Sequence, residues 1–226
     1  MNAPSNQWKP RLLIGGMAIL ALCINHHFLG KVKATRIQER QEQQSQMQAA
    51  ADQKAAQAVA AEHARYVARY VSTSSSPKNG HTVAVVAATE DGKLNSAITA
   101  ALAGKFQKDA RILSAFFTPD FISDGLFNDA FAGNAGQFQT LDLTNAVDVV
   151  VLARQDVQYS QSAALDNVIT ATMRLDVVAV PVAGKSDRTS WSFTAFGPGF
   201  SKEVARGAAE DRIIKQIAAD TKMSLK

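Results

Sequence analysis

The chain has 226 residues, of which 46% are hydrophobic and 19% charged, enough for one globular domain with accessory segments. Residues 1–79 hold ten Lys or Arg against four Asp or Glu, whereas residues 80–226 hold fourteen against sixteen. Because the second part is nearly neutral, composition disfavours nucleic-acid binding, and the basic arm fits a membrane-flanking segment. The single cysteine, Cys23, excludes an intrachain disulfide and disfavours a thiolate zinc site.

An uncharged apolar run follows Lys9 and Arg11 and extends to Gly30. Counted to Gly30, it reaches the length of about 20 residues that a membrane helix needs. We therefore expect a short tip and a retained membrane helix in residues 1–30. The residues expected to anchor it are Leu12, Leu13, Ile14, Ile19, Leu20, Leu22 and Ile24.

Other interpretations of this segment stay open. Cys23 could be the acylated residue of a lipoprotein signal, although Leu22 stands where a small residue is preferred. Cleavage after Ala34, or a buried helix of a soluble protein, are further alternatives. The pair His26-His27 suggests a metal site, but no third ligand is close in sequence, so we expect no metal and no other cofactor.

Residues 31–71 are rich in Ala, Gln, Glu and Arg, and from Thr35 to Tyr70 they contain neither Pro nor Gly. These are good helix formers, but the apolar stripe is thin, which predicts a solvated stalk helix or weak coiled coil. Such a stalk could make the protein a homo-oligomer, or merely continue the membrane helix. Residues 72–80 read as a flexible linker, so we expect a globular domain in residues 81–226.

The globular part predicts an α/β (α+β) fold in which a mixed sheet has the order β-α-β-α-β-β-β-α. The early βαβ unit should be a right-handed crossover, and the later strands an antiparallel meander. The elements are expected in residues 81–88, 93–107, 111–118, 119–131, 147–159, 167–182, 188–195 and 201–219.

The segment 167–219 carries the clearest pattern. Residues 167–182 alternate polar and apolar side chains, as a half-buried strand does, and a turn is expected at 183–187. Gly197-Pro198-Gly199 should end the next strand, because Pro lacks a ladder donor and Gly permits positive φ. Ser201 is the expected N-cap of the last helix.

No catalytic constellation is visible, and we expect no enzymatic activity. Gly197, Gly199 and Ser201 precede a helix and could bind a phosphate there, but they lack the ending of a P-loop. Asp120, Asp124 and Asp129 lack a partnered histidine and read as solvated helix residues. The arginines expected to form a partner-binding site are Arg154, Arg174 and Arg188.

Three stretches resemble an envelope-protein family. They are Val83–Val86, Asn145–Leu152, and the strand–strand–Gly-Pro-Gly–helix ending of residues 174–217. They are similar to the fold shared by curli-secretion channel subunits, TolB amino-terminal domains and penicillin-binding-protein activator lipoproteins. The resemblance covers residues 81–220 and implies a non-enzymatic envelope protein that works by protein–protein contact or assembly.

We therefore expect a single-pass inner-membrane protein whose α/β domain contacts other envelope proteins. The resemblance places that domain in the periplasm, whereas Lys31, Lys33, Arg36 and Arg40 after the apolar run favour the cytoplasm by the positive-inside rule. The alternative function is a small-ligand or nucleotide-binding sensor on a membrane tether.

Overall fold

The computed structural model describes residues 9–72, 80–161, 167–183 and 188–225, with the side chains of residues 9–35 left out. Two compact units are present, residues 1–61 and 62–226. Helix α1 (Lys9–Tyr70) accounts for the described part of the first unit, and its side chains from Arg36 to Ala61 are all exposed. This exposure agrees with the predicted solvated helix.

The predicted anchor, from Leu12 to Ile24, lies outside the residues whose side chains are described. Among the helices formed by the described residues, none is long and apolar enough to cross a membrane. The contacts within the chain place the start of the second unit at Glu62, within the last turns of α1. We call this unit, residues 62–226, the α/β domain; the predicted segment boundaries at 30, 71 and 80 stay predictions.

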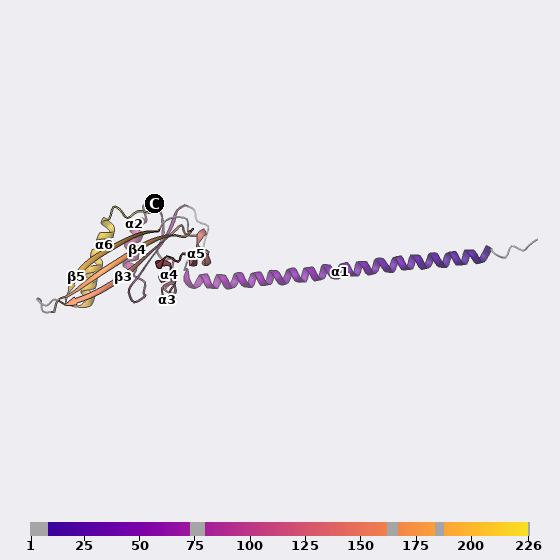
Figure 1. The fold of residues 1–226 in the computed structure, drawn as a ribbon, viewed down its shortest axis with the longest axis horizontal. Coiled ribbons are helices and arrows are strands. Elements are labelled where there is room, and N and C mark those ends of the chain that lie inside the picture. Colours follow the sequence, from indigo (N-terminus) through magenta and orange to yellow (C-terminus); the bar gives the residue numbers. More distant parts are fainter. Residues whose placement is uncertain (1–8, 73–79, 162–166, 184–187, 226) are drawn as a thin grey trace, which may run out of the picture. The chain divides into compact units, whose positions relative to one another are not determined.

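The α/β domain is built on a five-stranded mixed sheet of order β2-β1-β3-β4-β5 (Figure 1). Strand β1 pairs in parallel with both β2 and β3, while β3, β4 and β5 form an antiparallel meander. The class, the order and the meander predicted from the sequence are thus confirmed. The strands are β1 (Thr82–Ala88), β2 (Arg111–Leu113), β3 (Val149–Gln161), β4 (Ile169–Pro181) and β5 (Thr189–Gly199).

One face of the sheet is covered by two helices, α2 (Ser96–Phe106) and α6 (Lys202–Ala219). Apolar side chains one helical turn apart, such as Ala205, Ala209 and Ile213 on α6, pack on the odd-numbered side chains of the strands. Helix α6 therefore packs on the sheet, and the small side chains of Ala205 and Ala209 allow the close contact.

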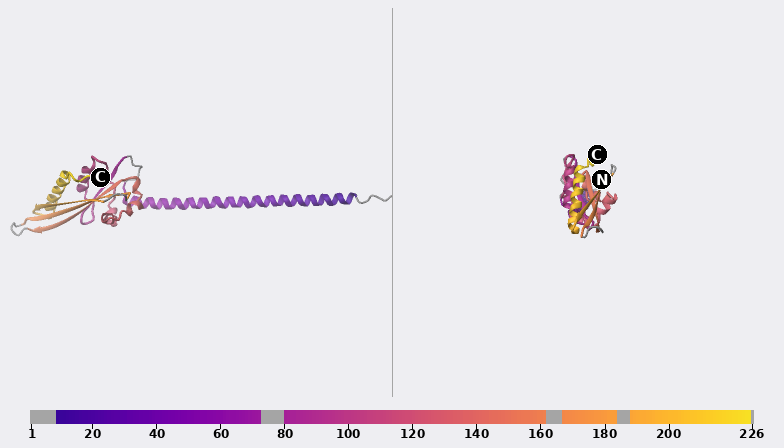
Figure 2. Two further views of the ribbon diagram at one scale, coloured as in Figure 1. Left: turned by 45° about the horizontal axis from the view of Figure 1, so that its top comes forward. Right: turned by 90° about the vertical axis from the view of Figure 1, so that its left-hand side faces the viewer.

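Short helices cover part of the opposite face (Figure 2). They are α3 (Asp120–Ser123), α4 (Leu126–Ala132), α5 (Gly136–Thr140) and the 3-10 helix η1 (Leu143–Asn145). Their aromatic side chains pack on even-numbered residues of β1, β3 and β4, among them Val86 and Leu152. Strand β1 lies between the two cores and is buried along its whole length, which explains its continuous apolar run.

Several predicted boundaries were wrong. The second strand ends at Leu113 instead of Thr118, because residues 116–118 pair with the end of α1. The single helix predicted over 119–131 is two helices, since Gly125 adopts φ +83° between them. Helix α2 begins at Ser96, not Lys93, because Asn95 is its N-cap. The predicted turn at 183–187 lies mostly outside the described residues.

Candidate functional site

The end of α1 is fastened to the α/β domain by a group of contacts that we call the clamp. Its backbone part is a small antiparallel bridge between Val71 and Phe117. The amide of Ser72 donates to the carbonyl of Phe116 over 2.8 Å, and the amide of Thr118 donates to the carbonyl of Tyr70 over 3.1 Å. The predicted flexible linker is therefore ordered at its first residue, Ser72.

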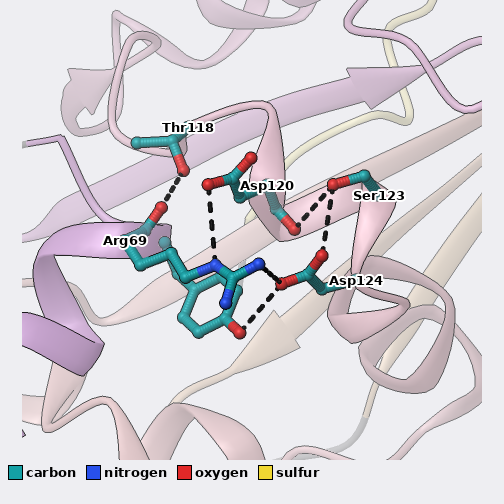
Figure 3. A network of polar contacts seen from close by, with 6 residues as sticks. Arg69, Thr118, Asp120, Ser123 and Asp124 are labelled. Carbon is teal, nitrogen blue, oxygen red and sulfur yellow. Dashed lines mark hydrogen bonds and ion pairs between the residues drawn. The ribbon is translucent and has the colours of Figure 1, made fainter.

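The side-chain part of the clamp converges on one carboxylate, that of Asp124 (Figure 3). Nη2 of Arg69 lies 2.8 Å from Oδ2 of Asp124, and the hydroxyl of Tyr70 donates to the same oxygen over 3.0 Å. Nε of Arg69 lies 3.7 Å from Oδ2 of Asp120. The hydroxyl of Thr118 donates to the carbonyl of Arg69, which satisfies one of the last carbonyls of the helix.

Tyr70 is buried, with 7% of its surface exposed. Desolvation raises the pKa of its phenol above the ordinary value of 10.0, and the hydrogen bond to Asp124 raises it further. Two turns earlier, Nε2 of His63 lies 2.9 Å from the carbonyl of Thr140 on α5. The last two turns of α1 are thus part of the domain rather than a loose tether.

Sequence reasoning missed this feature. It interpreted Asp120 and Asp124 as solvated helix residues, but both bind Arg69. Asp129 accepts a hydrogen bond of 2.7 Å from Nε2 of Gln137. No local pattern indicates this contact, because Arg69 lies far from both aspartates in the sequence.

A polar surface on β3, β4 and β5 remains uncovered beyond the short helices; we call it the open face. Register aligns its residues in rows across the strands: Asp176 stands between Arg154 and Ser192, and Arg174 stands between Asp156 and Thr194. Its side chains are mostly exposed and carry balanced charge. The open face consists of Arg154, Asp156, Gln158, Ser160, Thr170, Thr172, Arg174, Asp176, Ser190, Ser192, Thr194, Phe196 and Pro198.

The structure brings two of the three predicted partner-binding arginines together. The guanidinium carbons of Arg154 and Arg188 lie 4.7 and 5.8 Å from the ring centre of Phe131. Arg188 also donates to the carbonyl of Phe131. Arg174 lies apart from them and pairs with Asp176, with Nε 3.0 Å from Oδ1. Whether any of the three binds a partner stays a prediction.

The prediction that Gly197-Pro198-Gly199 forms a turn was wrong, because all three residues belong to β5 and pair with β4. Neither glycine adopts a positive φ; both allow helix α6 to pack closely against β5. A Cβ on Gly197 would stand 2.2 Å from the carbonyl oxygen of Ala205, and a Cβ on Gly199 would stand 2.5 Å from the backbone nitrogen of Ala205. The hydroxyl of Ser201 accepts from the amide of Val204, so Ser201 is the N-cap of α6 as predicted. Phosphate binding at these residues stays a prediction.

Strand β5 is an edge of the sheet, and its outer side is protected. Arg212 of α6 donates to the carbonyl of Phe196, and Gln216 donates to the carbonyl of Thr194 over 3.1 Å. Pro198, two residues further along the same side, has no N–H to offer. These features disfavour addition of another strand at β5.

Among the residues that the structure describes, no group of three His, Cys, Asp or Glu side chains could hold a metal ion. The pair His26-His27 lies outside the described side chains.

Comparisons with known proteins show distant similarity of fold only. No protein-family model matches the chain, and no curated protein sequence matches it. Lipoprotein GNA1162 from Neisseria meningitidis is 13% identical with a TM-score of 0.37, over 62% of this chain and 99% of its own. Protein CT253 from Chlamydia trachomatis is 15% identical with a TM-score of 0.36, over 62% and 95%. A PelC dodecamer from Paraburkholderia phytofirmans is 11% identical with a TM-score of 0.27, over 64% and 95%.

Proposed function

We propose that the α/β domain is a protein-interaction module that receives a partner protein on the open face. The single observation that carries this proposal is the asymmetry of the sheet. One face is covered by α2 and α6, whereas the β3–β5 part of the other face, from Arg154 onward, is left exposed. The exposed polar face of an antiparallel sheet is stable in water, and it is therefore accessible to a partner protein.

The chemistry of the open face favours a protein over nucleic acid or an anionic lipid surface. Its two arginines are matched by two aspartates directly opposite in register, so it offers no concentration of positive charge. Hydroxyl groups and one half-exposed aromatic ring, that of Phe196 (56% exposed), make up much of the rest. This mixture of polar groups with an aromatic side chain at the rim resembles the surface of transient protein complexes.

We further propose that α1 carries the domain on a single-pass anchor of the inner membrane, with the domain in the periplasm, and that residues 31–71 can self-associate.

The finer family assignment, to the domain of curli-secretion subunits, TolB and penicillin-binding-protein activators, rests on the sequence patterns of residues 81–220. It would make the partner another envelope protein and the protein non-enzymatic.

A co-purification of the full chain from crosslinked membranes tests the proposal. Thr194→Arg places a bulky charge in the middle of the open face, where Thr194 is exposed. Ala219→Arg adds the same charge at the exposed end of α6 and is the matched control. We expect the first variant to reduce a specific partner at least about tenfold, as a buried interfacial charge does, and the second to retain it. Equal recovery with both variants would contradict the open face as the site.

A further inference from the structure

A cavity of about 420 Å³ lies beside β1, away from the open face. It exists because β2 is short: β1 continues from Val85 to Ala88 beyond its last pairing with β2. The chain that follows β2 turns away to form the clamp, so Ser114 and Phe117 form a second wall opposite α2. The cavity opens near the carboxyl ends of two parallel strands, where α/β sheets commonly bind ligands.

The lining of this cavity is apolar and uncharged. Val85, Leu94 and Phe117 contribute to its walls, and no Lys, Arg, Asp or Glu is present among the described residues that line it. The described lining therefore offers no opposite charge to a nucleotide, a phosphate or a metal ion.

Hydroxyl groups give the cavity its polar contacts. The hydroxyl of Thr99 is already used, donating to the carbonyl of Asn95 over 2.7 Å and accepting from the amide of Ala87 over 3.1 Å. Ser96 and Ser114, by contrast, make no side-chain hydrogen bond to any residue within the described part of the chain. Two available hydroxyls beside an apolar wall suit a ligand with an apolar body and one hydrogen-bonding group.

We propose that this cavity binds a small, uncharged, largely apolar molecule that carries a hydroxyl or amide group. The volume is within the range of small-molecule sites, roughly 300–1,000 Å³. This site is distinct from the open face and does not depend on the proposed partner contact.

Occupancy of the cavity would also stabilise the clamp. Thr118 and Ser72 line the cavity and belong to the clamp, where their amides donate to the carbonyls of Tyr70 and Phe116. A ligand that contacts these residues only in the docked state stabilises that state by mass action. Binding in the cavity is thereby linked to how firmly the end of α1 is held.

Methyl NMR of the full chain in detergent tests the proposal with 1-naphthol as the probe and 1-naphthoate as its anionic counterpart. We expect saturable shifts of the Val85 and Leu94 methyl groups with 1-naphthol and none with 1-naphthoate. Hydrogen exchange at the amides of Ser72 and Thr118 should slow when 1-naphthol saturates the site. Absence of localised shifts with 1-naphthol, or equal shifts with the anion, would overturn the proposal.

Variants separate the cavity from general partitioning of the probe. Ala100→Phe fills the cavity and should abolish the shifts, whereas Ala97→Phe, also exposed on α2 but outside the lining, should retain them. Ser114→Ala is the milder change and should weaken binding about 3- to 10-fold through loss of one hydrogen bond. Binding that is unchanged in both Ala100→Phe and Ser114→Ala would place the probe elsewhere and overturn the assignment.

Discussion

Tyr70 and Asp124 are separated by 54 positions in the chain, yet the phenol of Tyr70 donates to Oδ2 of Asp124 over 3.0 Å. The same oxygen lies 2.8 Å from the guanidinium of Arg69. The carboxylate of Asp124 therefore binds the side chains of both Arg69 and Tyr70, the last two residues of α1. This relationship makes the final turns of the helix part of the α/β domain.

The clamp can be tested by removing its hydrogen bond. Tyr70→Phe keeps the buried ring but loses the bond to Asp124, so we expect the melting temperature of the domain to fall by about 2–4 °C. Tyr66→Phe is the matched control, because Tyr66 packs its ring against Tyr70 and makes no such bond. In an Asp124→Ala background, which lacks the acceptor, the effect of Tyr70→Phe should shrink; equal effects in both backgrounds would contradict the coupling.

The clamp also predicts a pH dependence. The pKa of Tyr70 is raised above 10.0 in the folded protein, first by desolvation and then by Asp124. The folded state thus favours the neutral phenol, and its contribution to stability is complete below pH 10.0 and is lost as the pH rises through the raised pKa. In a phenolate absorbance titration, Tyr70 should ionise later than in the unfolded chain, and Asp124→Asn should bring its pKa down. Ionisation of Tyr70 at or below its ordinary pKa would contradict the buried bond.

The contact of β5 with α6 predicts a strong effect of a single methyl group. In Gly197→Ala the new Cβ would stand 2.2 Å from the carbonyl of Ala205, which is backbone and cannot rotate away. We expect a loss of about 3 kcal/mol or more in the free energy of unfolding, measured in urea. Gly207 lies on α6, the helix that also contains Ala205, and has open space around it. Gly207→Ala should therefore be neutral or raise the free energy of unfolding by up to about 1 kcal/mol. A neutral Gly197→Ala would show that the helix does not pack this closely.

A buried polar contact joins α2, β3 and α6. Oδ1 of Asn95 accepts from the amide of Ile98 as the N-cap of α2, while Nδ2 donates to Gln155 over 2.7 Å and to Glu210 over 3.0 Å. Asn95→Asp keeps the cap but turns an oxygen toward two acceptors, so we expect a loss of about 2–4 kcal/mol at neutral pH.

Glu210→Gln provides the control for this prediction. It removes the carboxylate that faces position 95, so Asn95→Asp should be less harmful in the Glu210→Gln background. Chemical unfolding of the four proteins measures the difference. If Asn95→Asp costs the same in both backgrounds, the bond to Glu210 does not contribute.

The sequence predicted the fold where local pattern and tertiary structure agree. Alternation in residues 167–182 marks β4, and the nearly continuous apolar run at 81–88 marks β1, which is buried on both faces. The N-cap at Ser201 was also predictable, because a hydroxyl before a helix acts on the amides immediately after it.

The remaining features depend on contacts that local pattern does not contain. Gly197 and Gly199 look like turn residues, and only the approach of Ala205 from α6 explains them as strand residues. Pro198 is tolerated because β5 is an edge strand, which follows from the strand order and not from its neighbours in sequence. Likewise, nothing near Asp124 in the sequence indicates that Arg69 and Tyr70 would bind it.

The most direct test of the proposed partner contact is site-specific photocrosslinking in cells that express the full chain. A photoreactive amino acid at Thr194, in the open face, is compared with the same residue at Lys215, exposed on α6. The proposal predicts a discrete protein adduct from position 194 that is absent at 215. It also predicts that the adduct disappears when Arg174→Glu is added. Adducts of equal yield at both positions, or none at 194, would contradict the open face as the site of partner binding.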